Sequence, residues 1–484
     1  CGNKYVGPRR KERAMFPVVE RPKIVEHYAK YYAKVFSPAA LIQFERYISG
    51  LLVLENKSVE GINRLCVFES RNQSSLNRLL TESPFSLAAL NEARLAMMNS
   101  VEEMRIKGKG VLSIDDTLLS HHGKHFDEIA YLYDSAQGRY VWAHNLVTLH
   151  YSDEQTDYPV YFELWRPVQL EQLEQGLLAA KISLRESKQS LKQSAPAKWR
   201  QYLLGVWRRH QNKPEVAALY DSKLRIAERL LADWVQAHPG LKLPVAFDSW
   251  YTQPSFCHYL DQALHLPYVG TLTEDAQVVL QTGMEKVSDF AERLKQEQLS
   301  AVQPQQPAVF RPITIAYKGD KELYYSYCAT HRIHNFGKVR LVINHRRADL
   351  ADKPVYYITN QLNWQAAGIT RIRRHRWPVE VFHEEGKAEG LDQYQLRDFT
   401  AIERHVALVA VVYCLLRTAQ HDQALHHKLH CELKFDLEGS AAFWRRATQA
   451  QSLWALALFI STGLAQGHSL QTLMTPLLRT VCAL

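Results

Sequence analysis

The hydrophobic residues of this 484-residue chain change their spacing twice, and that change limits the possible fold more than any other feature. From about residue 22 to 105, and again from residue 367 nearly to the end, apolar residues recur every three or four positions, which predicts helices. The middle contains short runs rich in β-branched and aromatic residues, which predict strands. Such runs are residues 110–115, 139–150, 158–164 and 243–248. With an amphipathic helix predicted at 223–238, this order indicates a mixed α/β layer between two helical regions.

The charge balance of the chain is mildly basic. It carries 59 Lys and Arg residues against 50 Asp and Glu, a formal net charge of +9, which is compatible with a nucleic-acid partner. With 46% hydrophobic and 11% aromatic residues, the chain is not expected to be intrinsically disordered. Its seven cysteines form no Cys-x-x-Cys pair, so a disulfide scaffold is not expected. These features predict reduced thiols and a cytoplasmic protein.

The longest apolar run, residues 406–416, has 11 residues and is flanked by Arg404, His405 and Arg417. A helix that crosses a membrane needs about 20 apolar residues. The run therefore predicts a buried core helix, and no membrane partner is expected.

Four acidic residues stand at informative places. Asp115 and Asp116 follow the apolar run at 110–114, Asp248 follows the run at 243–247, and Glu380 lies near the start of a predicted helix. Carboxylates at the carboxyl ends of strands line the crevice where α/β sheets bind ligands. Such oxygens are the ligands that Mg²⁺ prefers, and a pair of ions can drive phosphodiester cleavage. An Asp after a strand can also serve only as a turn or a helix cap.

Two cations accompany Glu380. Arg376 precedes it by four residues and Lys387 follows it by seven, offsets that fall within about 40° of one another on a helix. One helix face would then carry a carboxylate for metal and two cations for phosphate, although surface ion pairs produce the same pattern. Pro378 favours a helix start near Trp377, so only Glu380 and Lys387 are firmly on one face.

These segments resemble the DDE transposases, with the greatest likeness to bacterial insertion-sequence transposases of the IS4/IS701 type. The similar segments are IDDT at 114–117, FDSWY at 247–251 and RHRWPVEVFHEEGKAEGLDQYQLRD at 374–398. The last one is the most specific, since Arg376, Glu380 and Lys387 match the family spacing of Tyr, two residues, Arg, three residues, Glu, six residues, Lys. Arg373 stands where the family has Tyr, which leaves the role of that position open.

The resemblance implies an RNase H-like fold, a mixed sheet with helices and with a β-rich insertion between the second Asp and the Glu. The implied domains are a helical DNA-binding region at 1–105, the first part of the catalytic core at 106–275 and the insertion at 276–360. The second part of the core follows at 361–417, and a helical region at 418–484. Within the first region, residues 57–85 suit either a helix-turn-helix or a plain helical bundle.

The resemblance also implies the chemistry. Two Mg²⁺ ions, for which Mn²⁺ would substitute, are expected on Asp248, Glu380 and either Asp115 or Asp116. Adjacent strand residues face opposite sides, so only one of the pair should ligate well, and Asp115 is slightly preferred. Arg376 and Lys387 would position phosphates. The expected partners are transposon ends and target DNA, bound by a homodimer associated with the nucleoid.

Three aromatic residues lie beside these acids. Trp250 and Tyr251 follow Asp248, and Trp377 precedes Glu380. Each could stack on an unpaired base or simply pack under the sheet.

The expected function is binding of terminal repeats followed by metal-dependent cleavage and strand transfer. Two alternatives remain: a nuclease of RNase H fold without strand transfer, and a non-catalytic DNA-binding descendant of a transposase. A non-catalytic descendant would have no use for three metal ligands.

Overall fold

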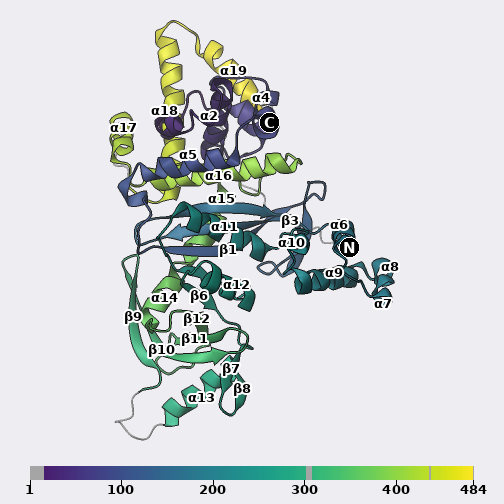
Figure 1. Ribbon diagram of the computed structural model, residues 1–484. Helices are drawn as coiled ribbons and strands as arrows, with labels where there is room; N and C mark the ends of the chain where they lie inside the picture. The colour runs from purple at the N-terminus through teal and green to yellow at the C-terminus, as the bar shows by residue number, and fades with distance from the viewer. Residues whose placement is uncertain (1–15, 301–307, 435–437, 483–484) are drawn as a thin grey trace, which may run out of the picture. The chain divides into compact units, whose positions relative to one another are not determined.

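The computed structural model describes residues 16–300, 308–434 and 438–482 and is drawn in Figure 1. The chain divides into two compact units. One unit combines the two ends, Cys1–Ile106 and Phe382–Leu484, and the other is the continuous middle, Lys107–Val381. We call them the helical unit and the sheet unit. The five domains drawn from the sequence stay a prediction, and their parts at 1–15, 301–307, 435–437 and 483–484 lie outside the described residues.

The helical unit is built from short and medium helices, several of which begin with a polar cap. Its first part holds α1 (Lys23–Tyr28), η1 (Ala29–Tyr31), α2 (Pro38–Val53), α3 (Val59–Leu65), α4 (Gln73–Thr81), α5 (Leu87–Asn99) and η2 (Glu102–Met104). The side chains of Ser37, Ser58, Asn72 and Ser86 accept backbone N–H groups at the starts of α2 to α5. Residues 66–72 connect α3 with α4, and both helices pack with α2. Whether they act as a helix-turn-helix stays open.

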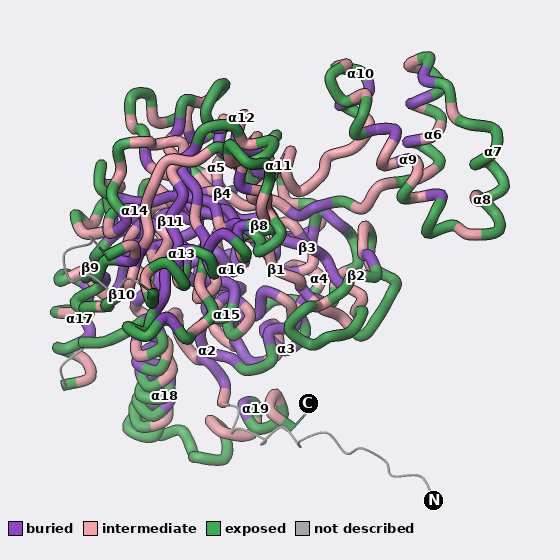
Figure 2. Tube along the Cα trace, turned by 90° about the horizontal axis from the view of Figure 1, so that it is seen from below, coloured by how far each residue is buried: buried purple, intermediate pink, exposed green. Residues whose placement is uncertain are grey.

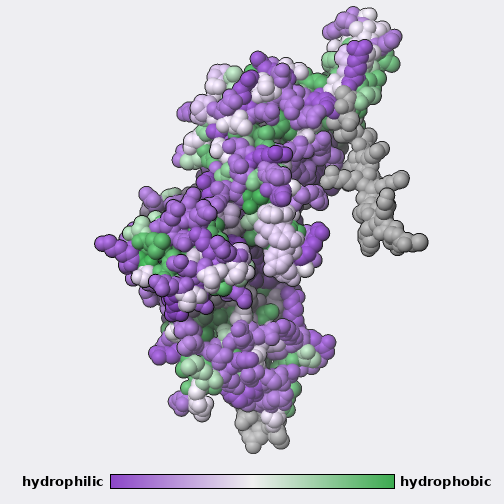
Figure 3. All heavy atoms as spheres, turned by 90° about the vertical axis from the view of Figure 1, so that its right-hand side faces the viewer, coloured by the Kyte–Doolittle hydropathy of each residue, from purple (hydrophilic) through white to green (hydrophobic). Residues whose placement is uncertain are grey.

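The second part of the helical unit supplies its central helix. It holds α16 (Phe399–Ala419), α17 (Gln423–Leu433), α18 (Ala441–Ala465) and α19 (Leu470–Cys482). Helices α2, α4, α5 and α18 pack against α16. By length and composition α16 could span a membrane, but 89% of its most apolar window is buried inside the protein. The predicted core helix is confirmed. The face drawn in Figure 3 is covered mainly by hydrophilic residues.

The sheet unit is organised around five strands of mixed direction. They are β1 (Val111–His121), β3 (Arg139–Ser152), β4 (Asp157–Trp165), β5 (Val245–Phe247) and β6 (Tyr268–Thr271). Their order is β4-β3-β1-β5-β6. The pairs β4-β3 and β3-β1 are antiparallel, whereas β1-β5 and β5-β6 are parallel. Helix α11 (Lys223–Ala237) packs against β3 and β4. This arrangement confirms the predicted RNase H-like α/β sheet.

One strand extends further than the sequence predicted. β1 was expected to end at Asp115 and Asp116, but it continues to His121, so both acids lie inside the strand. The reason is its antiparallel partner, because β3 pairs with β1 over the whole length from Val111↔Ser152 to His121↔Trp142. The short strand β2 (Ala130–Asp134) then pairs with the start of β3.

The β-rich insertion continues the same sheet. Its elements are β7 (Gln277–Leu280), β8 (Gly283–Lys286), α13 (Val287–Ser300), β9 (Arg311–Tyr317), β10 (Asp320–Ile333), β11 (Gly337–His345) and β12 (Val355–Thr359). The antiparallel pairing of β12 with β6 joins them to the core and gives a sheet of 12 strands. The sequence predicted a β-rich insertion at 276–360, and this part of the chain also contains the helix α13. Helix α14 (Ala366–Arg374) follows β12, and α15 (Trp377–Ala388) leads into the helical unit.

Between β4 and α11 the chain forms a group of helices. They are α6 (Leu170–Ala179), α7 (Glu186–Gln189), α8 (Leu191–Ser194), α9 (Pro196–His210) and α10 (Pro214–Ala217). These helices have a small apolar core of their own, which includes Leu173, Leu177, Trp199 and Trp207. In Figure 2 buried residues accordingly appear within this group of helices as well as in the main sheet.

Candidate active site

The parallel pairing of β1 with β5 brings two of the predicted acids to one edge of the sheet. Ile114 pairs with Phe247 at the end of this parallel ladder. The next residue on each strand is an acid, Asp115 on one and Asp248 on the other. The two carboxylates therefore follow neighbouring strands at the same level, as expected for a site at a sheet edge.

The neighbouring acids Asp115 and Asp116 have different surroundings. Successive residues of a strand point to opposite faces of the sheet. The carboxylate of Asp115 accepts a hydrogen bond from Arg376, whereas that of Asp116 forms an ion pair with Lys223. Asp115 and Asp116 therefore interact with different residues, and the two acids are not interchangeable.

Arg376 is the centre of the first group. Its guanidinium donates one hydrogen bond to Asp115 and another to Glu380, and the residue is only 7% exposed. The negative charges of Asp115, Glu380 and Asp248 each raise the pKa of Arg376 against the opposing effect of burial. Three of the predicted acids thus lie within electrostatic reach of a single buried cation.

The carboxyl group of Asp115 lies in an environment that disfavours its charged form, although Arg376 is its partner. Burial raises the pKa of its carboxyl to about 7, and the like charges of Asp248 and Asp116 add to that effect. Arg376 and the Asp116 backbone N–H act in the opposite direction. A carboxylate that is partly buried beside other carboxylates gains most from an added cation, because the cation offsets their repulsion.

Asp116 has its oxygens occupied by protein donors. The Nζ atom of Lys223 lies 2.9 and 2.8 Å from its two carboxylate oxygens. The Asn145 amide donates to Oδ2 at 2.6 Å, and the Tyr251 hydroxyl donates to Oδ1 at 3.0 Å. These contacts tie β1 to β3, to the start of α11 and to the loop after β5, which is a positioning role.

Asp248 shapes the loop after β5. Its Oδ1 atom accepts the backbone N–H groups of Trp250 at 3.0 Å and Tyr251 at 3.1 Å. This Asx-type turn fixes the carboxylate and places the Tyr251 hydroxyl on Asp116. One carboxylate oxygen of Asp248 is thus used locally.

The three candidate aromatic residues have different exposures. Tyr251 is fully buried, so the packing alternative describes it and direct stacking on DNA does not. Trp250 is 44% exposed and Trp377 is 48% exposed, so neither is packed under the sheet. The ammonium of Lys223 lies 4.0 Å from the centroid of the Trp250 ring, a cation–π contact that holds the indole beside the acids.

The structure places Arg373 and Lys387 differently. Arg373 donates to the Thr271 hydroxyl at 2.8 Å and lies over the Tyr357 ring, at the junction of β6 and β12. Burial, with repulsion from Arg376, lowers its pKa to about 10. Lys387 occupies the last turn of α15, whose first turn carries Glu380, and it belongs to the helical unit. The predicted DNA contacts of both residues stay predictions.

Sequence reasoning missed Lys223 and Asn145. Lys223 is separated from Asp116 by 107 positions and Asn145 by 29, so no local spacing connects them. The only available signal was that Lys223 begins the predicted amphipathic helix at 223–238, where a cation opposes the helix dipole and therefore calls for a nearby acid.

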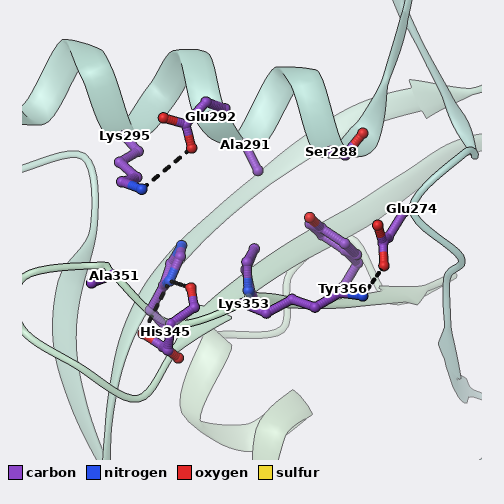
Figure 4. Close-up of a pocket in the computed structure, with 11 residues that line it drawn as sticks. Glu274, Ser288, Ala291, Glu292, Lys295, His345, Ala351, Lys353 and Tyr356 are labelled. Carbon is purple, nitrogen blue, oxygen red and sulfur yellow. Dashed lines mark hydrogen bonds and ion pairs between the residues drawn. The ribbon is translucent and has the colours of Figure 1, made fainter.

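A separate cavity of about 480 Å³ lies in the insertion, between α13 and the loop that joins β11 to β12. Figure 4 shows His345 on its floor, Glu292 and Lys295 on the helix, and a Lys353–Glu274 ion pair along one side. None of the predicted site residues lines this cavity. The acids of the sheet edge therefore form a distinct site.

The sheet order and the acids clustered at the end of its parallel ladder define an RNase H-like enzyme. A family model described as DDE superfamily endonuclease matches residues 33–286, just over half of the chain. The chain belongs to this family of enzymes, as the sequence motifs predicted. No curated protein matched the chain.

Among solved structures, the chain is similar to a piggyBac transposase in a synaptic complex with hairpin DNA. The two are 11% identical, with a TM-score of 0.38, and the alignment covers 92% of this chain and 82% of the other. So distant a likeness defines neither the fold nor the activity.

Endonucleases of the DDE family generally use divalent metal ions. Among the described residues, no three His, Cys, Asp or Glu side chains are grouped closely enough to hold a metal ion as they stand. At the sheet edge Arg376 pairs with Asp115 and Glu380 and supplies part of the positive charge among these carboxylates. The donor atoms of Asp115, Asp248 and Glu380 are all carboxylate oxygens, which fit a hard divalent cation.

Proposed function

We propose that this protein is a DNA transposase of the insertion-sequence type, which binds the terminal repeats of its own element, cuts them and joins them to a target. The observation that carries the proposal is the gathering of Asp115, Asp248 and Glu380 around the buried Arg376. Its membership of the DDE endonucleases supports the cutting step. Strand transfer and the choice of terminal repeats are inferred from the motif at 374–398.

In this proposal Asp115, Asp248 and Glu380 would hold two Mg²⁺ ions, for which Mn²⁺ would substitute. When bound, such ions activate an attacking oxygen and stabilise a leaving one. Asp116 is assigned a positioning role instead, because Lys223, Asn145 and Tyr251 already occupy its oxygens.

The chain's own residues orient the DNA. Arg376 is released from Asp115 and Glu380 and contacts a phosphate beside the scissile bond, as a planar guanidinium does well. Water attacks phosphorus in line, the P–O3′ bond breaks, and the departing oxygen takes up a proton as a free 3′-hydroxyl. That hydroxyl then loses its proton and attacks a phosphorus of the target strand in the same geometry. The P–O3′ bond of the target breaks, its 3′-oxygen takes up a proton, and no covalent bond to the protein forms.

Further contacts complete the proposed complex. Lys223 and the exposed Trp250 lie next to the acids and would meet the DNA together, with a phosphate on the ammonium and a base on the indole. Trp377, Arg373 and Lys387 are proposed to contact the same DNA. We also propose that the protein pairs two ends as a homodimer and acts at the nucleoid in the cytoplasm.

The test is cleavage of DNA that contains the boundaries of the element, in Mg²⁺ or Mn²⁺, by wild type and by Glu380→Gln, with DNA binding measured for both. We expect metal-dependent cuts at the boundary, followed by joined products, and loss of both in the variant while binding persists. Cuts without joined products would reduce the function to a nuclease. Tight binding with no cut by either protein would identify a non-catalytic descendant and overturn the proposal.

A further inference from the structure

The β2–β3 hairpin exposes a group of four aromatic rings. Tyr131 and Tyr133 on β2 pair with Trp142 and Tyr140 on β3, so the four side chains share one face of the hairpin. We call these four residues the aromatic platform. Tyr131, Tyr133 and Tyr140 are 55%, 55% and 58% exposed, and Trp142 is half-buried. Most of this hairpin is accordingly drawn as exposed or intermediate in Figure 2.

The rings of the platform form a continuous row. The Tyr131 ring centroid lies 5.4 Å from that of Tyr140, in a stacked arrangement, and 5.2 Å from that of Trp142. Tyr133 completes the row, with its centroid 5.2 Å from Tyr140. Aromatic rings dominate interfaces when they are covered, so three that stay more than half exposed indicate a surface for a partner.

The register of β1 and β3 places the platform on the same sheet face as Asp115. Directly paired residues of antiparallel strands point to the same side, and every second residue repeats that side. The pairs on this face are Asp115↔Thr148, Thr117↔Leu146, Leu119↔His144 and His121↔Trp142. Asp115 and the platform therefore lie toward the two ends of one row of side chains, whose middle residues Leu119, His144 and Leu146 are buried.

The separation between the platform and Asp115 corresponds to a short length of DNA strand. Along β3, Trp142 is six residues from Thr148, the partner of Asp115. At about 3.4 Å per strand residue this is roughly 20 Å, or about six nucleotides of a DNA strand. Phe126 packs on His121 between the two ends, with ring centroids 4.5 Å apart, so aromatic surface also fills part of the interval.

One cation lies beside the platform. Arg139 precedes Tyr140 and is exposed, and its Nε atom donates to the Gln137 side chain rather than to an acid. The acid opposite it, Asp134, is held in the hairpin turn by the N–H groups of Ala136 and Gln137. Exposed rings with a cation available beside them fit a nucleic-acid strand, whose bases stack on rings while its phosphates meet the cations.

We propose that the aromatic platform binds unpaired nucleotides of the DNA strand that extends from the cutting site, by stacking their bases on Tyr131, Tyr133 and Tyr140. The inference rests on the proposed function for the identity of the DNA. It concerns unpaired bases because a duplex presents no base faces along its length, whereas stacking on rings needs them and tolerates any sequence.

The test compares binding of two DNA molecules in EDTA, so that no cleavage occurs. One is a duplex with a thymine-rich single-stranded tail of about ten nucleotides, longer than the separation between the platform and Asp115, and the other is the same duplex without a tail. Wild type should prefer the tailed DNA by about tenfold or more, and Tyr131→Ser/Tyr140→Ser should lose that preference. The duplex affinity of the variant should stay unchanged.

Two matched variants keep the result interpretable. Tyr131→Phe/Tyr140→Phe keeps the rings and should retain the preference, which separates stacking from hydrogen bonding by the hydroxyls. Leu323→Ser changes a residue that is 50% exposed in the insertion and should behave as wild type. Thermal melting of each variant checks that the fold is intact, which the exposure of all these side chains favours.

An equal preference for the tailed DNA in wild type and Tyr131→Ser/Tyr140→Ser would overturn the inference. So would loss of self-association in that variant with tail binding intact, because the platform would then be a protein contact. Cleavage of element ends, measured in parallel in Mg²⁺, is the separate test of the proposed function. If element ends are cleaved but Tyr131→Ser/Tyr140→Ser keeps the preference for tailed DNA, only the platform inference is wrong. If no cleavage occurs but that variant loses the preference, only the transposase assignment is wrong.

Discussion

Buried charged groups occur in both units of the molecule, but they are arranged for different purposes. In the sheet unit, three acids (Asp115, Asp248 and Glu380) lie near two arginines, Arg376 and Arg373, so negative charge is left in excess. In the helical unit, Glu389 is matched by two cations, with Lys57 at 3.9 Å and Arg445 at 3.4 Å.

The pKa shifts alone do not separate the two places. Burial raises the pKa of Asp115 in one and of Glu389 in the other. The balance of charge separates them, since an excess of carboxylates invites an added cation, whereas a matched cluster is complete. A strongly shifted pKa therefore marks a candidate site only where the nearby opposite charges are too few to balance the buried group.

The largest effect is expected from a substitution within the candidate site of the sheet unit. Asp115→Asn should lower DNA cleavage by about a thousandfold, because loss of one metal-ligating oxygen removes about 4 kcal/mol of charge stabilisation. Its melting temperature should change little, since the substitution also removes a repulsion from Asp248 and Asp116. Cleavage rates and melting curves of the purified variant measure both quantities.

The matched control is the neighbouring residue. Asp116→Asn should lower cleavage only about tenfold and reduce stability by about 2 kcal/mol, because it leaves Lys223 without its partner. Full activity in Asp115→Asn, together with complete inactivity in a folded Asp116→Asn, would reverse the assignment of the two acids.

The second prediction concerns the matched cluster of the helical unit. Glu389→Gln should reduce stability by about 3 kcal/mol, because it leaves the buried Lys57 and the partly buried Arg445 without a counter-charge. Cleavage measured well below the melting temperature should stay within about twofold of wild type, as for a substitution outside the reacting groups. Thermal melting and cleavage assays give the two numbers.

A double variant sharpens this test. Lys57→Met/Glu389→Gln should recover part of the lost stability, because neither buried charge then remains unpaired. A cleavage defect as large as that of Asp115→Asn in folded Glu389→Gln would contradict the structural role of the cluster.

The sequence predicted the class of the fold better than the placement of its acids. The change from helical to strand spacing is local, and it correctly gave helical flanks, a mixed sheet and the core helix around 406–416. The length of β1 depends on β3, whose pairing residues run from Trp142 to Ser152, so the position of Asp115 inside the strand could not be seen.

The candidate site was predictable where its partners are close in sequence. An ion pair was the alternative interpretation of the four-residue spacing between Arg376 and Glu380, and the structure contains it. The pairing of Asp116 with Lys223 joins positions 107 residues apart and depends on how α11 packs. For that reason the sequence left Asp115 and Asp116 as alternatives, whereas their contacts distinguish them.

The smallest expected effect is a pH dependence that belongs to the helical unit alone. His405 is fully buried, bonded to the Tyr47 hydroxyl at 2.8 Å and to the Gly390 carbonyl at 2.7 Å. Burial lowers its pKa to about 4, below the value of about 6.5 in an unfolded chain. The unfolded state therefore binds more protons between these values, and the stabilisation present above about pH 6.5 is lost as the pH falls toward 4.

At about pH 5 this loss amounts to about 1–2 kcal/mol. His405→Gln keeps an amide donor for the Gly390 carbonyl but cannot titrate, so its melting temperature should fall less than that of wild type between about pH 7.5 and 5. Parallel melting curves at the two pH values provide the measurement. Equal falls in melting temperature for both proteins would show that protonating His405 does not destabilise the folded helical unit. Burial would then not keep this histidine neutral.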